Sequence, residues 1–158
     1  MKTESFKDKK VTVMGLGLFG GGVGAVKYLA SQGANVTVTD LKSAKELSAS
    51  LKLLDNVPVK LRLGKHDEED FVNVDMLVVN PAVPSDSTFL KLAIENGVRI
   101  DSELSIFFRL CTAPVIGITG SNGKSTTTSL LGEMLKESGI KTWVGGNIGI
   151  SLLENLDE

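Results

Sequence analysis

The sequence predicts an α/β fold: a Rossmann-like parallel-sheet domain followed by the truncated start of a P-loop ATPase-type α/β domain. Short β-branched runs alternate with helical apolar patterns along the chain, which is typical of right-handed β-α-β units with parallel strands. Two glycine-rich loops, at residues 15–20 and 117–126, each lie between such a run and a helical pattern. We therefore expect a first domain over residues 1–102 and the beginning of a second, incomplete one over residues 103–158.

The first domain is expected to alternate strands with helices. Extended segments are expected at residues 11–14, 35–39, 59–63, 75–80 and 98–100, where apolar and β-branched residues dominate. Helices are expected at residues 23–32, 43–54 and 85–96. Gly33 and Gly97 are typical helix ends, and Ser85 or Asp86 is suited to cap the third helix.

The second unit is expected to start with a connecting helix at residues 102–110. A strand is expected at residues 113–118, a helix at 124–136 and an extended segment at 141–144. Two strands and one helix bury little apolar surface. We therefore expect this domain to be cut short and the chain to be the N-terminal piece of a larger protein.

The composition excludes several classes of function. Of the 158 residues 42% are apolar and 23% charged, and the net charge is −2, so a nucleic-acid partner is not indicated. No apolar stretch is long enough to span a membrane, and we expect a cytoplasmic protein. The single cysteine, Cys111, and the single histidine, His66, exclude a His/Cys zinc site. We expect structural roles for both side chains.

The first loop has the pattern G-x-G-x-x-G, formed by Gly15, Gly17 and Gly20. Glycines at these positions permit a tight turn and let the start of the following helix approach a diphosphate. Asp40 lies twenty residues after Gly20 at the end of the next strand, where a carboxylate can accept hydrogen bonds from a ribose or a base. Two plainer interpretations stay open: a glycine turn without a ligand, and a solvated Asp40.

The second loop indicates phosphate binding more specifically than the first loop does. The residues expected to bind ATP are Gly120, Ser121, Asn122, Gly123, Lys124, Ser125 and Thr126. Their backbone N–H groups can wrap a phosphate, and Lys124 is the expected catalytic cation on the β/γ oxygens. The Ser125 hydroxyl is the expected ligand of Mg²⁺. The pattern departs from the common one, because its first glycine, Gly117, lies one residue early.

The presence of two phosphate-binding loops on one chain reduces the number of enzyme classes that fit the sequence. An NAD-dependent dehydrogenase would use the first loop and leave the second idle, whereas a simple ATPase would do the reverse. An enzyme that activates a nucleotide-carrying substrate with ATP uses both.

The second loop resembles the ATP-binding loop of the Mur ligases, which also carry the early glycine. A second run, Val144-Gly145-Gly146-Asn147-Ile148-Gly149, is similar to the signature of the Mur ligases that add D-glutamate. The resemblance covers the whole chain. Folylpolyglutamate synthases share the ATP-binding domain but lack this leading domain, which argues against them.

The resemblance implies that the first domain holds the UDP of UDP-N-acetylmuramoyl-L-alanine. The residues that match substrate-contacting positions of the family are Gly17, Leu18, Phe19, Asp40, Lys42, Asn80 and Asn147. Asp40 matches the acidic residue that recognises the uracil base. The chain departs from the family at Lys42, where arginine is usual, at Leu41, where a hydroxyl residue is common, and at Asn80, where a serine-type residue is expected.

The implied reaction belongs to peptidoglycan precursor synthesis. ATP phosphorylates the alanyl carboxylate, and the amine of D-glutamate then attacks the acyl phosphate to form an amide. Lys124 and Mg²⁺ would neutralise charge on the transferred phosphoryl group. The family's remaining catalytic groups match no residue of this chain, so we expect a monomer that does not form the amide alone. The alternatives are a Mur-type ligase for another amino acid, an NAD-binding oxidoreductase and a free-standing nucleotide sensor.

Overall fold

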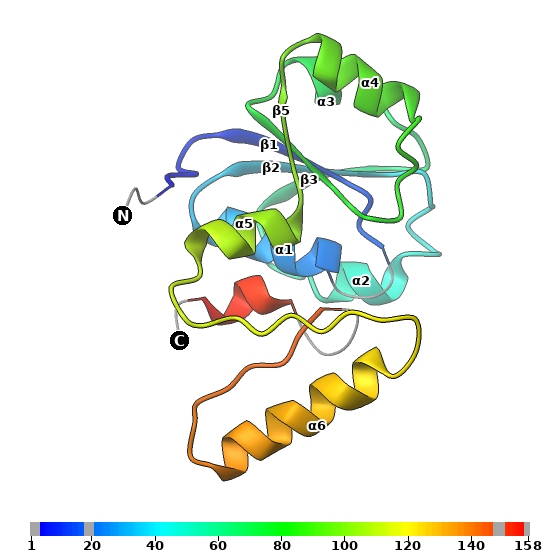
Figure 1. Ribbon diagram of the computed structural model, residues 1–158. Coiled ribbons are helices and arrows are strands. Elements are labelled where there is room, and N and C mark those ends of the chain that lie inside the picture. The colour runs from blue at the N-terminus through cyan, green and yellow to red at the C-terminus, as the bar shows by residue number, and fades with distance from the viewer. Residues whose placement is uncertain (1–3, 18–20, 147–150, 157–158) are drawn as a thin grey trace.

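Figure 1 shows the fold in a computed structural model, which describes residues 4–17, 21–146 and 151–156. Five parallel strands pair in the order β3-β2-β1-β4-β5. They are β1 (Lys10–Met14), β2 (Asn35–Asp40), β3 (Val59–Leu63), β4 (Met76–Val79) and β5 (Arg99–Asp101). The order reverses between β1 and β4, so a topological switch point lies where these two strands end. The parallel sheet confirms the predicted Rossmann-like class.

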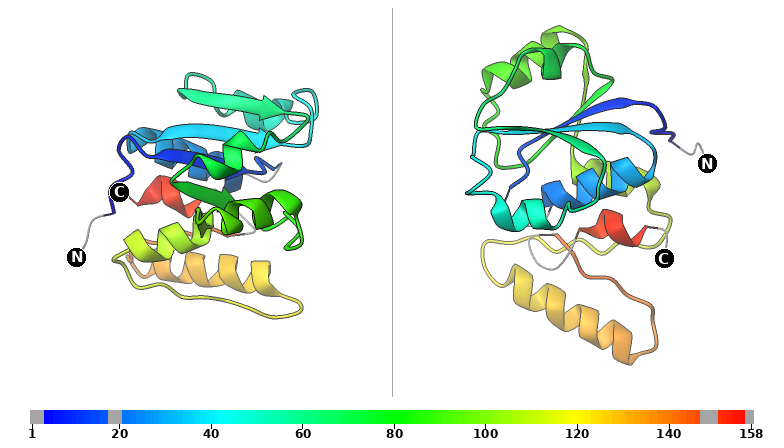
Figure 2. Two further views of the ribbon diagram at one scale, coloured as in Figure 1. Left: turned by 90° about the horizontal axis from the view of Figure 1, so that it is seen from above. Right: turned by 180° about the vertical axis from the view of Figure 1, so that it is seen from behind.

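Helices cover the sheet on both faces (Figures 1 and 2). One face carries α1 (Gly21–Ser31), α2 (Ser48–Lys52), α5 (Glu103–Leu110) and the 3₁₀ turn η1 (Leu152–Asn155). The other carries α3 (Glu69–Val72) and α4 (Thr88–Glu95). The central strands β1 and β4 are apolar runs because helices bury both of their faces. Strand β3 lies at the edge of the sheet, as predicted. The alternation expected along it is wrong, because the neighbouring residues Lys60 and Leu61 are both exposed.

Two apolar clusters hold these layers together. The larger one joins β1 and β2 to α1 and α5, and its fully buried members include Val11, Val38, Leu29 and Ile106. The smaller one, on the opposite face, joins Met14, Leu77 and Ala93 to Phe71. Burial of such side chains contributes about 1.5–3 kcal/mol each, which makes the sheet a rigid support for the loops at its edge.

Several helix boundaries differ from the prediction. Residues 44–47 form turns, so α2 is much shorter than the predicted helix at 43–54. The predicted caps Ser85 and Asp86 are wrong, because α4 starts at Thr88 after Ser87. The four-residue helix α3 was not expected, since it is too short to show helical periodicity. Ser102 caps α5 by accepting a hydrogen bond from the Ser105 N–H.

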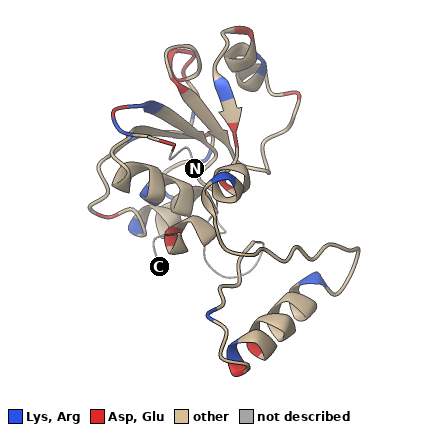
Figure 3. Cartoon of the chain, turned by 60° about the vertical axis from the view of Figure 1, so that its left-hand side comes forward, with Lys and Arg blue, Asp and Glu red and all other residues tan. Residues whose placement is uncertain are grey.

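The second unit contains its predicted helix but not its predicted strands. Helix α6 (Lys124–Glu137) is present, and Figure 3 shows it apart from the sheet on two extended tethers. Residues 113–118 and 141–144 form no strand, and the Val115 and Ile116 side chains are exposed. A strand needs a neighbour with which to pair, and neither segment has one among residues 103–146. The expected start of a second sheet is therefore wrong for this structure.

Across the described part of the chain, none of the helices combines the length and apolar character that crossing a bilayer requires.

Candidate functional site

The first glycine loop is held in place by Asp40. The buried carboxylate accepts hydrogen bonds from the N–H groups of Leu16 at 2.9 Å and Gly17 at 3.4 Å through Oδ2. Its Oδ1 accepts a bond from the Lys42 N–H at 2.9 Å. The structure thus brings Gly17 and Asp40 together through the loop backbone, a contact that was not part of the prediction for Asp40. It also shows that Asp40 is not a solvated strand end: its carboxylate fixes the loops that follow β1 and β2.

Asn80 closes the loop from the side of β4. Its Oδ1 accepts a hydrogen bond from the Ala82 N–H at 3.0 Å, which fixes the turn that follows the strand. A Cβ on Gly15 would lie 3.0 Å from the Asn80 Cβ, and one on Gly17 would lie 3.1 Å from Nδ2. Both glycines also have positive φ, at 87° and 68°. Larger residues therefore fit neither the space nor the backbone conformation.

Ser50 on α2 makes a contact that sequence reasoning missed. Its buried hydroxyl donates to the Gly17 carbonyl at 2.7 Å. The two residues are 33 positions apart and share no motif, so no sequence signal pointed to the contact. Together, Asp40, Asn80 and Ser50 hold the Gly17 turn from three elements.

A small cavity lies at the switch point beside this loop. It has a volume of about 30 Å³ and is lined by Gly15, Gly22, Asn80 and Glu103, among others. The first N–H groups of a helix lack partners within it, so the start of α1 favours an anion here. Glu103 was also missed by the sequence analysis. Burial raises the pKa of its carboxyl, and the nearby Glu154 raises it further, whereas the hydrogen bond from Ser151 lowers it.

Three predicted substrate contacts, Leu18, Phe19 and Asn147, lie outside the described residues. Lys42 is exposed, and its backbone N–H lies beside the Asp40 carboxylate at the carboxyl edge of the sheet. The described first-loop residues thus converge on one edge of the sheet, because the carboxyl ends of parallel strands meet there.

The second loop leads into α6 through Gly123, which has φ of 78° and precedes the first helical residue, Lys124. The Lys124 ammonium donates to the carbonyls of Gly120 at 2.5 Å and Ser121 at 3.3 Å, so it folds back over its own loop. The loop is exposed and its cation lies at the helix start, where backbone N–H groups are free to meet a phosphate. This geometry suits an anion site.

A divalent cation would find one ligand on this loop. Ser125, the second residue of α6, offers a hydroxyl at the helix start. Across the described residues, no three His, Cys, Asp or Glu side chains group closely enough to hold a metal. Magnesium is commonly held by few protein groups together with phosphate oxygens and water, so Ser125 fits a role as one ligand among these.

His66 and Cys111 have the structural surroundings that were predicted. The His66 ring makes edge-on contacts with Phe71 and Phe89, and its Nδ1 lies 2.6 Å from the Thr39 hydroxyl. Burial lowers its pKa. Cys111 is half-buried and packs against the larger apolar cluster.

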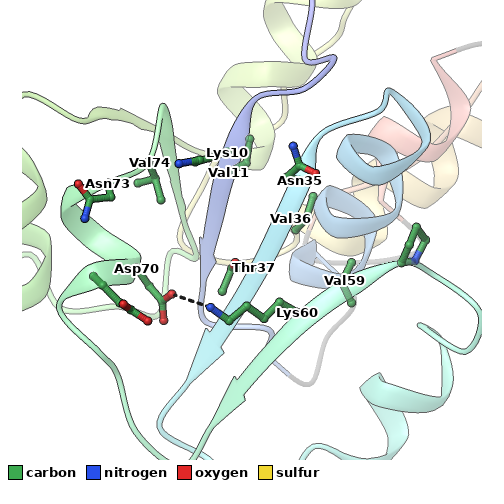
Figure 4. A pocket seen from close by; sticks show the side chains of 12 residues that line it. Lys10, Val11, Asn35, Val36, Thr37, Val59, Lys60, Asp70, Asn73 and Val74 are labelled. Atoms are coloured by element: carbon green, nitrogen blue, oxygen red, sulfur yellow. Dashed lines mark ion pairs between the residues drawn. The ribbon is translucent and has the colours of Figure 1, made fainter.

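A larger cavity lies elsewhere, on the sheet face beside α3 (Figure 4). It measures about 570 Å³, and Lys60 reaches across it to Asp70 at 3.8 Å. Its strand residues come from the amino-terminal halves of β1, β2 and β3. Ligands of parallel sheets bind at the carboxyl ends of the strands, so this open cavity is not the candidate site.

Comparison with known proteins identifies the family of the first domain. The profile described as "Mur ligase MurD-like, N-terminal domain" matches residues 9–102. The chain belongs to the MurD-like Mur ligases. The UDP-N-acetylmuramoylalanine–D-glutamate ligase of Roseiflexus sp. (strain RS-1) is 49% identical over 148 residues, which make up 94% of this chain and 32% of that protein. The chain thus spans about a third of the length of the curated relatives that it matches.

Two solved structures share the fold of this MurD-like chain. A pseudomurein peptide ligase type C from Methanothermus fervidus has a TM-score of 0.54 and 31% identity, covering 84% of this chain and 27% of that one. The UDP-N-acetylmuramate:L-alanyl-gamma-D-glutamyl-meso-diaminopimelate ligase from Neisseria meningitides has a TM-score of 0.59 and 20% identity, covering 91% and 46%. The second likeness concerns the fold alone.

Proposed function

We propose that this chain provides the UDP-substrate-binding domain and the ATP-binding loop of a ligase that joins D-glutamate to UDP-N-acetylmuramoyl-L-alanine. The observation that carries the proposal is the glycine loop after β1, which Asp40 and Asn80 hold beside the start of α1 in a MurD-like domain. The names of the curated relatives support D-glutamate as the amino acid. We also infer that the chain is a monomer and acts in the cytoplasm.

Asp40 has the remaining hydrogen-bonding capacity to recognise uracil. A carboxylate offers about four lone-pair sites. Hydrogen bonds from the Leu16, Gly17 and Lys42 N–H groups occupy three of them. The remaining site can accept a bond from the imide N–H of uracil. The three backbone bonds also prevent rotation of the carboxylate, so it is preorganised for a planar base.

The diphosphate would lie against the start of α1. The N–H groups of Leu16 and Gly17 already donate to Asp40, so among the described residues the amides left for phosphate are those of the first turn of α1. Lys42 would add a point charge rather than the bidentate contact of an arginine. We include the predicted contacts Leu18, Phe19 and Asn147 in this proposed site.

The chemistry assigned to the second loop is phosphoryl transfer from ATP. A carboxylate is a poor electrophile, and its phosphorylation supplies a leaving group that an amine can displace. Residues 120–126 would wrap the phosphates, and the Lys124 ammonium would exchange the Gly120 and Ser121 carbonyls for phosphate oxygens. Mg²⁺, with Ser125 as one ligand, would supply charge neutralisation at the transferred group.

Ligand-dependent thermal stability of the purified 158-residue chain tests the proposal. UDP-N-acetylmuramoyl-L-alanine at one hundred times its Kd should stabilise the fold by about 2.7 kcal/mol. NAD at the same concentration should leave the melting temperature unchanged. Stabilisation by NAD and none by the UDP ligand would replace the proposal with a dinucleotide-binding function.

A further inference from the structure

The segment 151–156 returns from the second unit and docks on the first domain. Leu153 is fully buried in the larger apolar cluster, and Leu152 and Leu156 pack against the same cluster. Figure 1 shows η1 lying along α1 and α5 on the side away from the sheet. An ion pair of 3.3 Å joins Glu154 to Lys27 of α1. This short segment is therefore bound by apolar and charged contacts together.

The surface of α1 is shaped to accept this segment. A Cβ on Gly24 would lie 2.0 Å from the Ser151 Cβ and 2.1 Å from its Oγ. Glycine inside a helix costs about 1 kcal/mol relative to alanine. Gly24 therefore lowers the intrinsic stability of α1 at the place where Ser151 needs the space.

Glu103 completes the docking site from α5. Its Oε1 accepts a hydrogen bond from the Ser151 hydroxyl, and its Oε2 lies against the start of α1, 2.6 Å from where a Cβ of Gly21 would lie. The same side chain lines the small cavity beside the first glycine loop. A half-buried carboxylate is costly unless it is paired. Here it connects three features: the helix start, the cavity and the returning segment.

The docking limits where α6 can lie. Val144 packs on α6, since a Cβ on Gly132 would lie 2.4 Å from its Cγ2. The seven peptide units from Val144 to Ser151 span at most about 25 Å. With Ser151 fixed on α1, the helix that carries Lys124 is restrained by this tether as well as by residues 111–123.

We propose that Glu103 and Gly24 are positioning residues: they seat segment 151–156 on the first domain and so hold α6, with the second loop, at a limited distance from the first loop. Under the proposed function, on which this part rests, the restraint would limit how far the ATP-binding loop can move from the domain that binds the UDP substrate. Neither residue needs to touch a reacting atom.

Two ligand-free measurements on the full chain test the proposal. Hydrogen exchange reports whether the Glu154 and Leu156 amides stay protected, since both donate within the docked segment. Fluorescence energy transfer measures the distance between the second unit and the first domain. The donor is Trp143, the single tryptophan of the chain. The acceptor is a probe attached at Lys52→Cys on α2, in a Cys111→Ser background. We expect Gly24→Ala and Glu103→Ala to speed exchange at both amides about tenfold and to broaden the distance distribution.

Two further variants separate positioning from general stability. Glu103→Gln keeps an acceptor for Ser151, so its exchange should be no faster than in the wild type and its distances should be unchanged. Ser31→Ala at the exposed end of α1 is the matched control. Wild-type exchange in both Gly24→Ala and Glu103→Ala would overturn the docking role. Faster exchange with an unchanged distance distribution would overturn the positioning role. Failure of the wild-type chain to bind the UDP substrate would count against the proposed function alone, because neither readout uses a ligand.

Discussion

The Asp40 carboxylate accepts a hydrogen bond from the Leu16 N–H at 2.9 Å and thereby joins the loops that follow β1 and β2. Both residues are buried, and the bond spans 24 positions of the sequence. A fingerprint acid is usually considered for its contact with a ligand. In this domain the acid holds the glycine loop through backbone hydrogen bonds, so under the proposed function one side chain would couple binding to local stability.

Substitution of Asp40 should therefore cost stability as well as binding. Asp40→Ala removes the acceptor of three backbone N–H groups, and each donor left unpaired in a buried site costs about 1–3 kcal/mol. We expect the free energy of unfolding to fall by about 2–4 kcal/mol, since the loops can relax and admit water. Urea unfolding measures it, with Asp55→Ala at an exposed position as the control. A loss no larger than that of the control would mean that the carboxylate has no structural role.

Ser50 should contribute to the same loop in a smaller way. Ser50→Ala removes the donor to the Gly17 carbonyl and should reduce the free energy of unfolding by about 1 kcal/mol. Ser48→Ala lies in the same short helix at an exposed position and is the matched control. Hydrogen exchange of the Leu16 and Gly17 amides should rise in Ser50→Ala only. Equal effects of the two variants would show that the change acts on α2 rather than on the loop.

The first domain could be predicted from the sequence because each signal is local. The β-branched run before Gly15 and the helix end at Gly33, where φ is 81°, depend on neighbouring residues only. Gly17 and Asp40 were predicted from the glycine motif and the acid after the next strand, whereas Asn80 was predicted only from the resemblance to the Mur ligases; the three lie together because parallel strands end at a common edge. Ser50 and Glu103 could not be predicted, since their contacts depend on how helices pack across 33 and 48 positions.

The second unit shows the limit of the same reasoning. Residues 113–118 have strand propensity, but a strand exists only when another strand pairs with it. Helix α6 satisfies its own backbone hydrogen bonds and therefore formed where it was predicted. The two outcomes differ because a strand depends on a tertiary partner for its backbone hydrogen bonds, whereas a helix does not.

Removal of the Lys124 cation should affect one of the two proposed ligand sites and leave the other unchanged. Lys124→Ala should weaken ATP binding about 10- to 100-fold, since hydrogen bonds from a charged donor contribute about 1.5–3 kcal/mol. Binding of UDP-N-acetylmuramoyl-L-alanine should stay unchanged. Isothermal titration calorimetry with each ligand checks both statements, and Lys136→Ala near the other end of α6 is the control. Equal loss of both ligands would contradict the division into two sites, and absence of ATP binding by the wild type would contradict the assignment of the loop.

The raised pKa of Glu103 should make stability depend on pH in a definite direction. Burial raises this pKa above its usual value near 4.5, so between the two values the folded state binds more protons than the unfolded state. The contribution of Glu103 to stability is therefore fully present below about pH 4.5 and is lost as the pH rises through the folded value. Glu103→Gln keeps the acceptor for Ser151 but removes the charge beside Glu154.

We therefore expect Glu103→Gln and the wild type to unfold at the same urea concentration at pH 4, and the variant to be the more stable at pH 7.5. The lowered pKa of His66 has the opposite sign, stabilising the fold as the pH rises toward 6.5, but it acts in both proteins and cancels in the difference. Glu133→Gln, at an exposed position on α6, should show no such divergence. A variant less stable than the wild type at pH 7.5 would mean that the Glu103 charge is compensated in the fold, and that Ser151 holds a carboxylate better than an amide.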